Sequence, residues 1–498
     1  MSFHGRDGEL QRRMGRMVGY EASADGRYTR IVDRFTLHRE PLDFRALAAR
    51  VLRPNTRYLL LDLDRTTHRG LNLGELLGWE IASYKYFGDA LIHADVPRLR
   101  GRLLQDPARK QRTPGYLIDG ARRWAFPGLS YLLWGKLTAK SELLERWSYR
   151  KFGSEPIRAV QRLPQTALLH DLATLPKDTL RMLSRRVWEL ASPAQVIDRA
   201  DLAWVRERCP GIRIILTSAS PQPIVEVAGE MLGVDACEFS VTKDLGDYYA
   251  SPYWVDRRFA LERLDTLATP SEVRINSGHA KIERLLERYP DLLDDGVESV
   301  GMSDTGYGED HAWGQFLSVV VDVNSTSPFP PLVSFDSPLR EVHSAQLLTR
   351  DERACARPGE TVSLTASELA PWLVGVRSKL EHLAAECARV REQLAPGRAA
   401  LAGELGRERR QIERVVRRYN GAAPAEKPSL LGALRRQLRG EAKVMRRIAE
   451  LEQPLSYASM AVTKALLESR QALGVQLAEA PHRQPARELE PLFEASPA

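Results

Sequence analysis

Residues 57–67 of the 498-residue chain read RYLLLDLDRTT, an apolar run that ends in two aspartates. Two later stretches have the same form: IRIILTSASP at 212–221 and VESVGMSDTG at 297–306. Continuous apolar runs of this length, without polar alternation, are typical of strands that are buried on both faces of a parallel sheet. The three runs therefore predict an α/β fold in which helices cover a parallel central sheet.

Polar side chains close each of the three predicted strands. They include Asp62 and Asp64 after the first strand, Ser218 after the second and Asp304 after the third. In open α/β sheets, ligands bind beyond the carboxyl ends of the strands. We therefore expect these four side chains to converge on one crevice.

A long insertion separates the first two strands. Asp62 and Ser218 are 156 positions apart, whereas a crossover between parallel strands needs only about a dozen residues. Within the insertion, apolar residues recur at three- and four-residue spacing at 71–93 and at 128–153. This spacing predicts helices, and we expect a mainly helical cap.

Asp62 and Asp64 flank a single leucine, so their carboxylates leave the strand on the same side. One carboxylate can attack phosphorus to give an aspartyl-phosphate, while a second protonates the leaving oxygen and later activates water. Asp62 suits the first role and Asp64 the second. The alternative is that the two aspartates only cap a turn.

Two residues are candidates for binding phosphate. Ser218 ends the second strand, where its hydroxyl and the backbone N–H groups of the next turn can hold a phosphoryl oxygen. Lys281 opens the amphipathic pattern KIERLLERY, where its charge can balance phosphate and the Asp62 carboxylate. The alternatives are a helix-capping serine and a solvated surface lysine.

More carboxylates follow the third strand, where Asp304 precedes Glu309 and Asp310. Magnesium takes oxygen ligands, usually one or two protein carboxylates together with water and substrate phosphate. Asp62, Asp304 and the main-chain carbonyl of Asp64 would meet this requirement, and Asp310 could orient the site or bind through water. The alternative is an acidic loop in which Asp304 caps a turn.

The order of these motifs resembles the haloacid dehalogenase (HAD) superfamily. The stretch TSASPQPIVEVAGEMLGVD at 217–235 and the helical insertion resemble its phosphoserine-phosphatase-like branch, which has a helical C1-type cap. The resemblance implies a Rossmann-like parallel sheet and a Mg²⁺-dependent phosphohydrolase that acts on a small phosphorylated substrate through an aspartyl-phosphate. It assigns catalysis to Asp62 and Asp64, phosphate binding to Ser218 and Lys281, and metal binding to Asp62, Asp64, Asp304 and Asp310.

Two positions depart from the family pattern. Arg65 stands where the family usually has a small residue or Asp, and Gly308 stands where the second acid of the last motif is usual. Glu309 and Asp310 are the acids that could replace it. These departures leave an alternative open, in which the chain is a catalytically altered HAD-like scaffold or regulatory protein that acts through its C-terminal helices.

Composition sets the broad class. Hydrophobic and charged fractions of 43% and 28% are ordinary for a soluble protein, and no apolar run of about 18 residues could span a bilayer. No secretory signal follows the basic start, so we expect a cytoplasmic protein. The four cysteines form no CxxC pair, which argues against a zinc site or a disulfide framework.

The chain becomes helix-patterned and charged after about residue 366. Breaks at 396–397, 420–428 and 454 divide this region into three predicted helices, and apolar residues at alternating spacings of three and four predict that these helices pack together. The seam residues are Val376, Leu380, Leu383, Cys387, Val390 and Leu394, then Leu401, Leu405, Ile412, Val415 and Tyr419, then Leu434, Leu438, Met445, Ile448 and Leu455.

Basic residues cluster off these seams, at 407–418 and 435–447. Glutamates are interspersed among them, and aromatic residues that could stack on bases are nearly absent. The sequence therefore favours domain docking or homo-oligomerisation through the helices over binding to nucleic acid or an anionic membrane.

These patterns predict six parts. We expect an N-terminal segment at 1–55 packed on the core, the catalytic core at 56–67 and 206–330, the cap at 68–205, an irregular Pro- and Ser-rich linker at 331–365, a helical bundle at 366–480 and a flexible tail at 481–498.

Overall fold

The computed structural model of the chain describes residues 30–70, 72–88, 168–254, 266–306, 310–325, 329–333, 337–355 and 361–479. Its main strands are β2 (Arg34–His38), β3 (Thr56–Asp62), β4 (Arg213–Pro221), β5 (Ala236–Ser240), β8 (Glu298–Ser303), β9 (Val319–Val323), β11 (Glu341–Ala345) and β12 (Thr361–Thr365). Its main helices are α2 (Phe44–Val51), α3 (Leu73–Phe87), α10 (Lys177–Ala191), α11 (Arg199–Arg208), α12 (Gln222–Leu232), α13 (His279–Arg288), α14 (Ala366–Gly421) and α15 (Lys427–Glu479).

Short elements complete the described residues. The strands β1 (Arg30–Ile31) and β10 (Leu332–Val333) form one small pair, and β6 (Ser251–Pro252) and β7 (Leu267–Ala268) form another. The 3₁₀ helices are η3 (Ser192–Ala194), η4 (Pro270–Glu272), η5 (Pro290–Leu293), η6 (His311–Gln315) and η7 (Arg353–Cys355).

The eight main strands form one sheet in the order β12-β2-β11-β9-β8-β3-β4-β5. Every neighbouring pair is parallel except the edge pair of β12 with β2. The predicted strands at 57–67, 212–221 and 297–306 correspond to β3, β4 and β8, which lie side by side. The prediction of an α/β fold with a mostly parallel sheet is confirmed.

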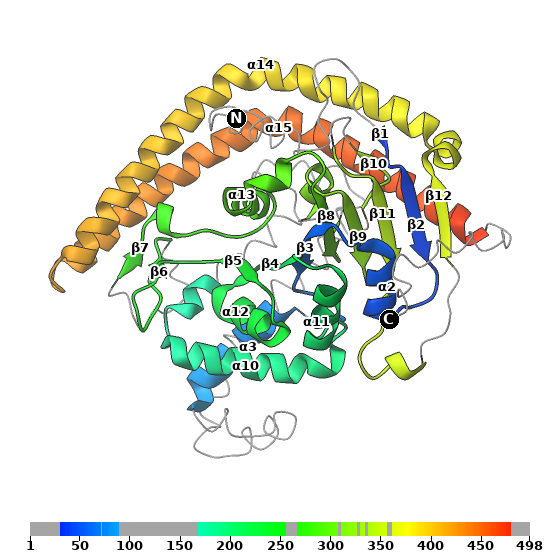
Figure 1. Cartoon of the computed structure of the whole chain (residues 1–498). Helices are drawn as coiled ribbons and strands as arrows, with labels where there is room; N and C mark the ends of the chain where they lie inside the picture. The colour runs from blue at the N-terminus through cyan, green and yellow to red at the C-terminus, as the bar shows by residue number, and fades with distance from the viewer. Residues whose placement is uncertain are drawn as a thin grey trace.

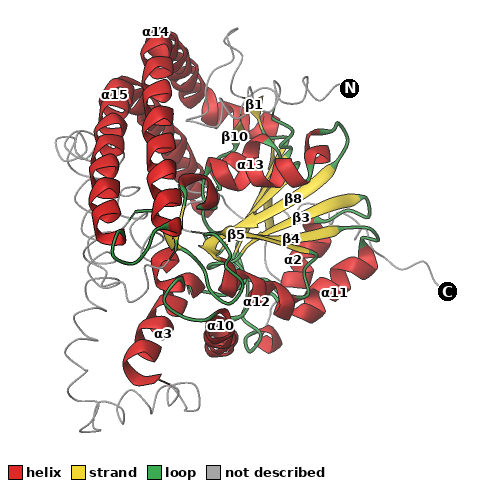
Figure 2. Cartoon of the chain, turned by 90° about the vertical axis from the view of Figure 1, so that its left-hand side faces the viewer, coloured by secondary structure: helices red, strands yellow, loops and turns green. Residues whose placement is uncertain are grey.

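Both faces of this sheet are covered, which explains the unbroken apolar run in β3. Leu59 and Leu61 are buried in a core cluster on one face, and Leu60 is buried in a second cluster on the other face. Successive side chains of a strand point to opposite faces, so a strand covered on both sides is apolar at consecutive positions. Helices α10, α11 and α12 lie on one side of the sheet and α13 on the other (Figure 2).

The expectation of an irregular linker at 331–365 is wrong. Strand β11 lies inside the sheet between β2 and β9, and β12 forms its edge. The sequence EVHSA at 341–345 is short and half polar, but Val342 and His343 are buried. Pairing with β2 also makes the N-terminal segment from residue 34 part of the sheet.

The described part of the insertion is helical, but its C-terminal helices pack on the sheet. Leu180 and Val187 of α10 are buried in the same cluster as Leu59 and Leu61 of β3. The layered core therefore includes α10 and α11, both of which begin before the expected boundary at residue 206. Residues 89–167, with the helix expected at 128–153, lie outside the described residues, as do 1–29 and 480–498.

The C-terminal region forms two long helices, whereas we expected three. Helices α14 and α15 run antiparallel beside each other in an arc over the core (Figure 1). Pro396 lies inside α14 and Pro454 inside α15. An interior proline costs about 3 kcal/mol, and burial of apolar residues such as Val390 and Leu401 on either side of Pro396 offsets that cost at about 1.5–3 kcal/mol per large side chain.

The apolar seam of α14 is largely buried within the chain itself. Leu380, Cys387 and Val390 pack in the cluster on the α13 side of the sheet, and Ile412 packs with Leu434 of α15. Further along α15, the expected seam position Met445 is instead 41% exposed, and the neighbouring Val444 is buried. None of the described helices is long and apolar enough to cross a membrane.

Candidate active site

The predicted site residues meet at the carboxyl ends of β3, β4 and β8. Lys281 Nζ of α13 donates a hydrogen bond to Asp62 Oδ1 at 2.8 Å and lies 2.6 Å from Asp310 Oδ1. Asp62 ends β3, and Asp310 directly precedes η6. All three side chains are buried, with exposed fractions of 7%, 1% and 0% for Asp62, Lys281 and Asp310. Three stretches far apart in the sequence thus form one buried charged cluster.

Asp62 is surrounded by more negative than positive charge. Burial raises the pKa of its carboxyl group well above the ordinary value, and the nearby Asp310, Asp304 and Asp64 carboxylates raise it further. Only Lys281 lowers this pKa. A cation bound at this position would interact strongly with these carboxylates, because charges attract each other more strongly in a buried environment of low polarity than in water.

Asp64 is held in place by three hydrogen bonds. The backbone N–H of Leu73 donates to Oδ1 at 2.6 Å, and the hydroxyls of Ser220 and Ser218 donate to Oδ2 at 2.7 and 3.3 Å. Burial raises the pKa of Asp64, although these hydrogen bonds oppose the rise. A carboxyl group with a raised pKa and a fixed orientation is suited to proton transfer.

Ser218 is buried and lies next to Asp64, as the motif order predicts. Its hydroxyl also accepts a hydrogen bond from the backbone N–H of Ser220 at 3.1 Å. Asn276 fixes the same turn, because its Nδ2 donates to Thr217 Oγ1 at 3.2 Å and to the Ser218 carbonyl at 3.0 Å. Sequence reasoning missed Ser220 and Asn276 as supporting residues, although Ser220 lies in the stretch 217–235 that carried the resemblance and Asn276 lies five residues before Lys281.

Lys281 is oriented by its carboxylate partners and by the packing of α13. Burial alone would lower the pKa of this lysine, but Asp310 and Asp62 raise it above the ordinary value. The ammonium group also lies 5.1 Å from the centre of the Trp313 ring, where the aromatic face attracts a cation. Lys281 is therefore a fixed positive charge, and the alternative of a solvated surface lysine is wrong.

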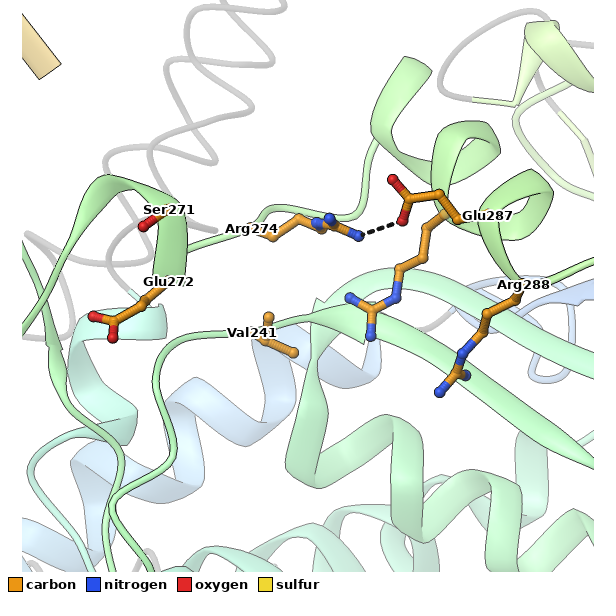
Figure 3. A pocket seen from close by; sticks show the side chains of 7 residues that line it. Val241, Ser271, Glu272, Arg274, Glu287 and Arg288 are labelled. Carbon is orange, nitrogen blue, oxygen red and sulfur yellow. Dashed lines mark hydrogen bonds and ion pairs between the residues drawn. The ribbon is translucent and has the colours of Figure 1, made fainter. Parts of the chain in front are cut away.

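Two further basic residues anchor α13, and both lie nearer its C-terminal end than Lys281. Arg284 and Arg288 form ion pairs with the fully buried Glu238 of β5. Beside them is a pocket of about 360 Å³ that is lined by Val241, Ser271, Glu272, Arg274, Arg284, Glu287 and Arg288 (Figure 3). Its arginines face glutamates, as in the pair of Arg274 with Glu287, and none of the candidate catalytic residues lines it.

Asp310 and Asp304 differ in their surroundings. Both oxygens of Asp310 are engaged, Oδ1 by Lys281 and Oδ2 by the hydroxyls of Ser303 and Thr305 at 2.6 and 3.2 Å. The Asp304 carboxylate is buried, and no described residue donates a hydrogen bond to it. Burial first, and the Asp310 carboxylate second, raise the pKa of Asp304 to about 7.

These surroundings decide which residues could hold a divalent cation. No group of three or more Asp, Glu, His or Cys side chains gathers in a metal-binding arrangement in the described parts of the chain. Magnesium, however, is commonly held by one or two carboxylates with waters and substrate phosphate. Asp62, of which Lys281 contacts only Oδ1, and the unpartnered Asp304 carboxylate fit that requirement, whereas both oxygens of Asp310 are already engaged.

Arg65, one of the two departures from the family pattern, has an unusual backbone conformation. Its φ angle is 61°, in the left-handed region that non-glycine residues rarely adopt. The side chain is exposed, so it does not crowd Asp64. Its positive charge opposes the rise in the pKa of Asp304 and of Glu75, which burial causes. Arg65 therefore adds a positive charge that acts on Asp304. Gly308 and Glu309, at the other departure, lie outside the described residues.

No protein-family model matches the chain, and no curated protein matches it in sequence. A solved structure of a protein of unknown function from Bordetella pertussis Tohama I has a TM-score of 0.32 at 14% sequence identity, over 54% of this chain and 92% of that one. A HAD family hydrolase from Salmonella enterica subsp. enterica serovar Typhi has a TM-score of 0.28 at 9% identity, over 55% and 65% of the two chains.

A probable phosphoserine phosphatase from Vibrio cholerae also has a TM-score of 0.28, at 8% identity over 55% of this chain and 58% of that one. Structural similarity this low carries no argument about this chain. The fold class is therefore inferred from the strand order given above, and the site is inferred from the contacts of its own residues.

Proposed function

We propose that the chain is a Mg²⁺-dependent phosphomonoesterase that acts on a small phosphorylated substrate through an aspartyl-phosphate on Asp62. The observation that supports this proposal most strongly is the contact of Lys281 with both Asp62 and Asp310, 2.8 and 2.6 Å away. A buried carboxylate at a strand end, beside a fixed cation, suits attack on a phosphate group. We also propose that the chain belongs to the phosphoserine-phosphatase-like branch and that it has the helical cap of that branch.

In the first step, an Asp62 oxygen forms a bond to phosphorus while the bond from phosphorus to the substrate oxygen breaks. Asp64 donates its proton to that leaving oxygen, and its raised pKa keeps the proton available. Ser218 and Lys281 bind the phosphoryl oxygens and balance their negative charge. The product alcohol then leaves.

In the second step, Asp64 takes a proton from a water molecule, and the water oxygen attacks phosphorus. The bond between phosphorus and Asp62 breaks, which releases inorganic phosphate and restores the Asp62 carboxylate and the protonated Asp64. Ser220 and the backbone of Leu73 hold Asp64 in one orientation through both proton transfers. Asp310 acts through Lys281, which it positions.

Asp62, Asp304 and the main-chain carbonyl of Asp64 would hold the magnesium ion. When bound, the ion neutralises charge between the phosphate and the two carboxylates, which lowers the barrier to attack. Without a bound cation, no described residue pairs with the buried Asp304 carboxylate, which agrees with its raised pKa.

A screen of phosphomonoesters with Mg²⁺ tests the proposal, with Asp62→Asn as the inactive variant and the exposed Asp295→Asn as the matched control. We expect turnover that Asp62→Asn abolishes and that chelation of the metal stops. Asp304→Asn should raise the Mg²⁺ concentration for half-maximal rate at least about tenfold, since it removes a carboxylate ligand. Retained turnover in Asp62→Asn would contradict the assignment of the nucleophile.

A further inference from the structure

The positive charge of the chain is concentrated in one part of it. Residues 401–450 contain 13 Arg and Lys and 6 Asp and Glu, so this segment alone has a formal charge of +7, equal to that of the whole chain. The segment comprises the second half of α14, the turn that follows and the first half of α15. In Figure 1 it is the left-hand end of the helix pair, away from the centre of the sheet.

Ten of the eleven exposed basic residues of this segment form two regular stripes, and the eleventh, Arg409, pairs with Glu441. Residues spaced by three and four lie on one face of a helix, and both helices repeat the spacing of three, four and three. All ten side chains are exposed. The α14 stripe consists of Arg407, Arg410, Arg414, Arg417 and Arg418, and the α15 stripe of Arg436, Arg439, Lys443, Arg446 and Arg447.

Most of this charge is not neutralised by the chain. Arg417 pairs with Glu413, and Arg447 pairs with Glu404. No other residue of the two stripes forms an ion pair with a described residue. The stripes also lie opposite the buried seams, because Ile412 and Val416 of α14 and Leu434 and Val444 of α15 face inward.

Burial of the seams argues against homo-oligomerisation through these helices, which the sequence favoured over binding to nucleic acid or a membrane. An apolar seam that is already filled by the core and by the second helix leaves little apolar surface for a second copy of the chain. Met445 is the only exposed large hydrophobic side chain that the structure describes within 401–450. Helices that lie on membranes insert an apolar face between their basic residues, and this segment has no such face.

We propose that the two stripes bind the phosphate backbone of a duplex nucleic acid. The stripe on α14 runs from Arg407 to Arg418, a rise of about 16 Å at 1.5 Å per residue, and such a length of duplex carries about ten phosphate charges. Nine of the ten stripe residues are arginines, whose planar donor groups pair with phosphate oxygens better than lysine does. Because aromatic residues for base stacking are scarce, the contact is to the backbone and not to the bases. This inference does not depend on the proposed phosphatase activity.

The experiment measures binding of the full chain to a fluorescent 24-base-pair DNA duplex and to an RNA duplex of the same sequence, over a range of salt concentrations. One variant changes the five α14 residues to Gln, a second changes the five α15 residues, and a third changes the α14 residues to Lys. Gln preserves helix propensity. The charge-matched control replaces five exposed arginines of the core by Gln: Arg181, Arg185, Arg199, Arg213 and Arg350.

We expect the affinity of the full chain for at least one duplex to fall as salt rises, with a log–log slope of about −9 for ten phosphate contacts and about half that slope in each Gln variant. Each Gln variant should lose at least about tenfold in affinity at ~0.1 M salt, whereas the Lys variant and the core control should keep most of it. Circular dichroism and light scattering on the same samples establish that fold and mass are unchanged.

Three results would overturn the proposal. The first is equal affinity of both Gln variants and the wild type, and the second is an equal loss in the core control. The third is binding to phosphatidylserine vesicles, or self-association through the stripes, in the absence of any binding to either duplex. A preference for DNA or for RNA identifies which duplex the surface takes.

Discussion

At the scale of single residues, the candidate site depends on side chains whose charges are balanced only by one another. Lys281 is the one cation in contact with Asp62 among the described residues, and Asp310 holds its other side. Removal of one partner from a buried ion pair typically costs about 3–5 kcal/mol, because it leaves an uncompensated charge.

Lys281→Met should therefore abolish turnover and also lower the free energy of unfolding by a few kcal/mol. Adding Asp310→Asn to this variant removes one of the two stranded carboxylates, so the double variant should regain part of the lost stability while it stays inactive. Urea unfolding and phosphatase assays on the three proteins measure both effects. A double variant less stable than Lys281→Met would contradict the role of Asp310 as the partner of this lysine.

Ser220→Ala tests the orientation of Asp64. The Ser220 hydroxyl lowers the pKa of Asp64 through its hydrogen bond, so its loss should raise that pKa and shift the pH–rate profile to higher pH. A hydrogen bond to a charged group contributes about 1.5–3 kcal/mol, and we expect a loss in kcat of roughly tenfold or more. Ser271→Ala, at an exposed position, is the control. An unshifted profile in Ser220→Ala would show that Asp64 does not depend on this contact.

At the scale of elements, α14 is held to the core by its buried seam. Leu380 is 1% exposed and lies in the same cluster as Phe35 of β2, whereas Val374 on the same helix is 63% exposed. Leu380→Ala should destabilise the chain by about 2–5 kcal/mol, and Val374→Ala by less than about 0.5 kcal/mol. Thermal and urea unfolding measure the difference. Equal stability of the two variants would mean that α14 does not dock through this face.

A buried pair of histidines joins β2 to β11. The rings of His38 and His343 stack with their centres 5.7 Å apart, and Arg50 Nη1 lies 3.1 Å from His38 Nδ1. Because arginine only donates hydrogen bonds, this nitrogen accepts, and the His38 ring is neutral. Burial first, and then the neighbouring His343 and Arg50, lower the pKa of His38 to about 3.

We expect the chain to lose stability in acid partly through His38. A histidine in the unfolded chain binds its proton near pH 6.5, but His38 in the fold does so only near pH 3. The stabilisation by the neutral ring is therefore complete above pH 6.5 and is lost as the pH falls toward 3, by up to about 1.4 kcal/mol per pH unit. His38→Gln should reduce the pH dependence of the unfolding free energy in this window. The exposed His382→Gln should leave it unchanged, and the opposite pattern would contradict the assignment.

At the scale of the whole molecule, the sequence was most informative where burial alone determined the residue type. The run Leu59–Leu61 predicted a strand covered on both faces, and the positions of Asp62, Ser218 and Asp304 at the ends of three predicted strands predicted their convergence. Ser220 and Asn276 could not be placed, because the hydrogen bonds they make join segments that only the fold brings together.

Errors arose where tertiary packing outweighed local signals. The segment at 341–345 is too short and too polar to predict a strand, yet β11 pairs on both of its sides inside the sheet. Pro396 is a local signal for a helix end, but α14 continues because its apolar residues pack on both sides of the proline. In both cases the stabilising contacts come from residues distant in the sequence.

The most direct test of Asp62 as the nucleophile is to trap the phosphorylated enzyme. The chain is mixed with a small reactive phosphate donor such as acetyl phosphate or p-nitrophenyl phosphate, with Mg²⁺, and then treated with borohydride, which reduces an aspartyl-phosphate to homoserine. We predict that mass spectrometry finds homoserine at position 62 in the wild-type chain and in Asp64→Asn, and none in Asp62→Asn. Turnover of the donor without any modification at Asp62, or with the modification at another carboxylate, would contradict the assignment of Asp62 as the nucleophile.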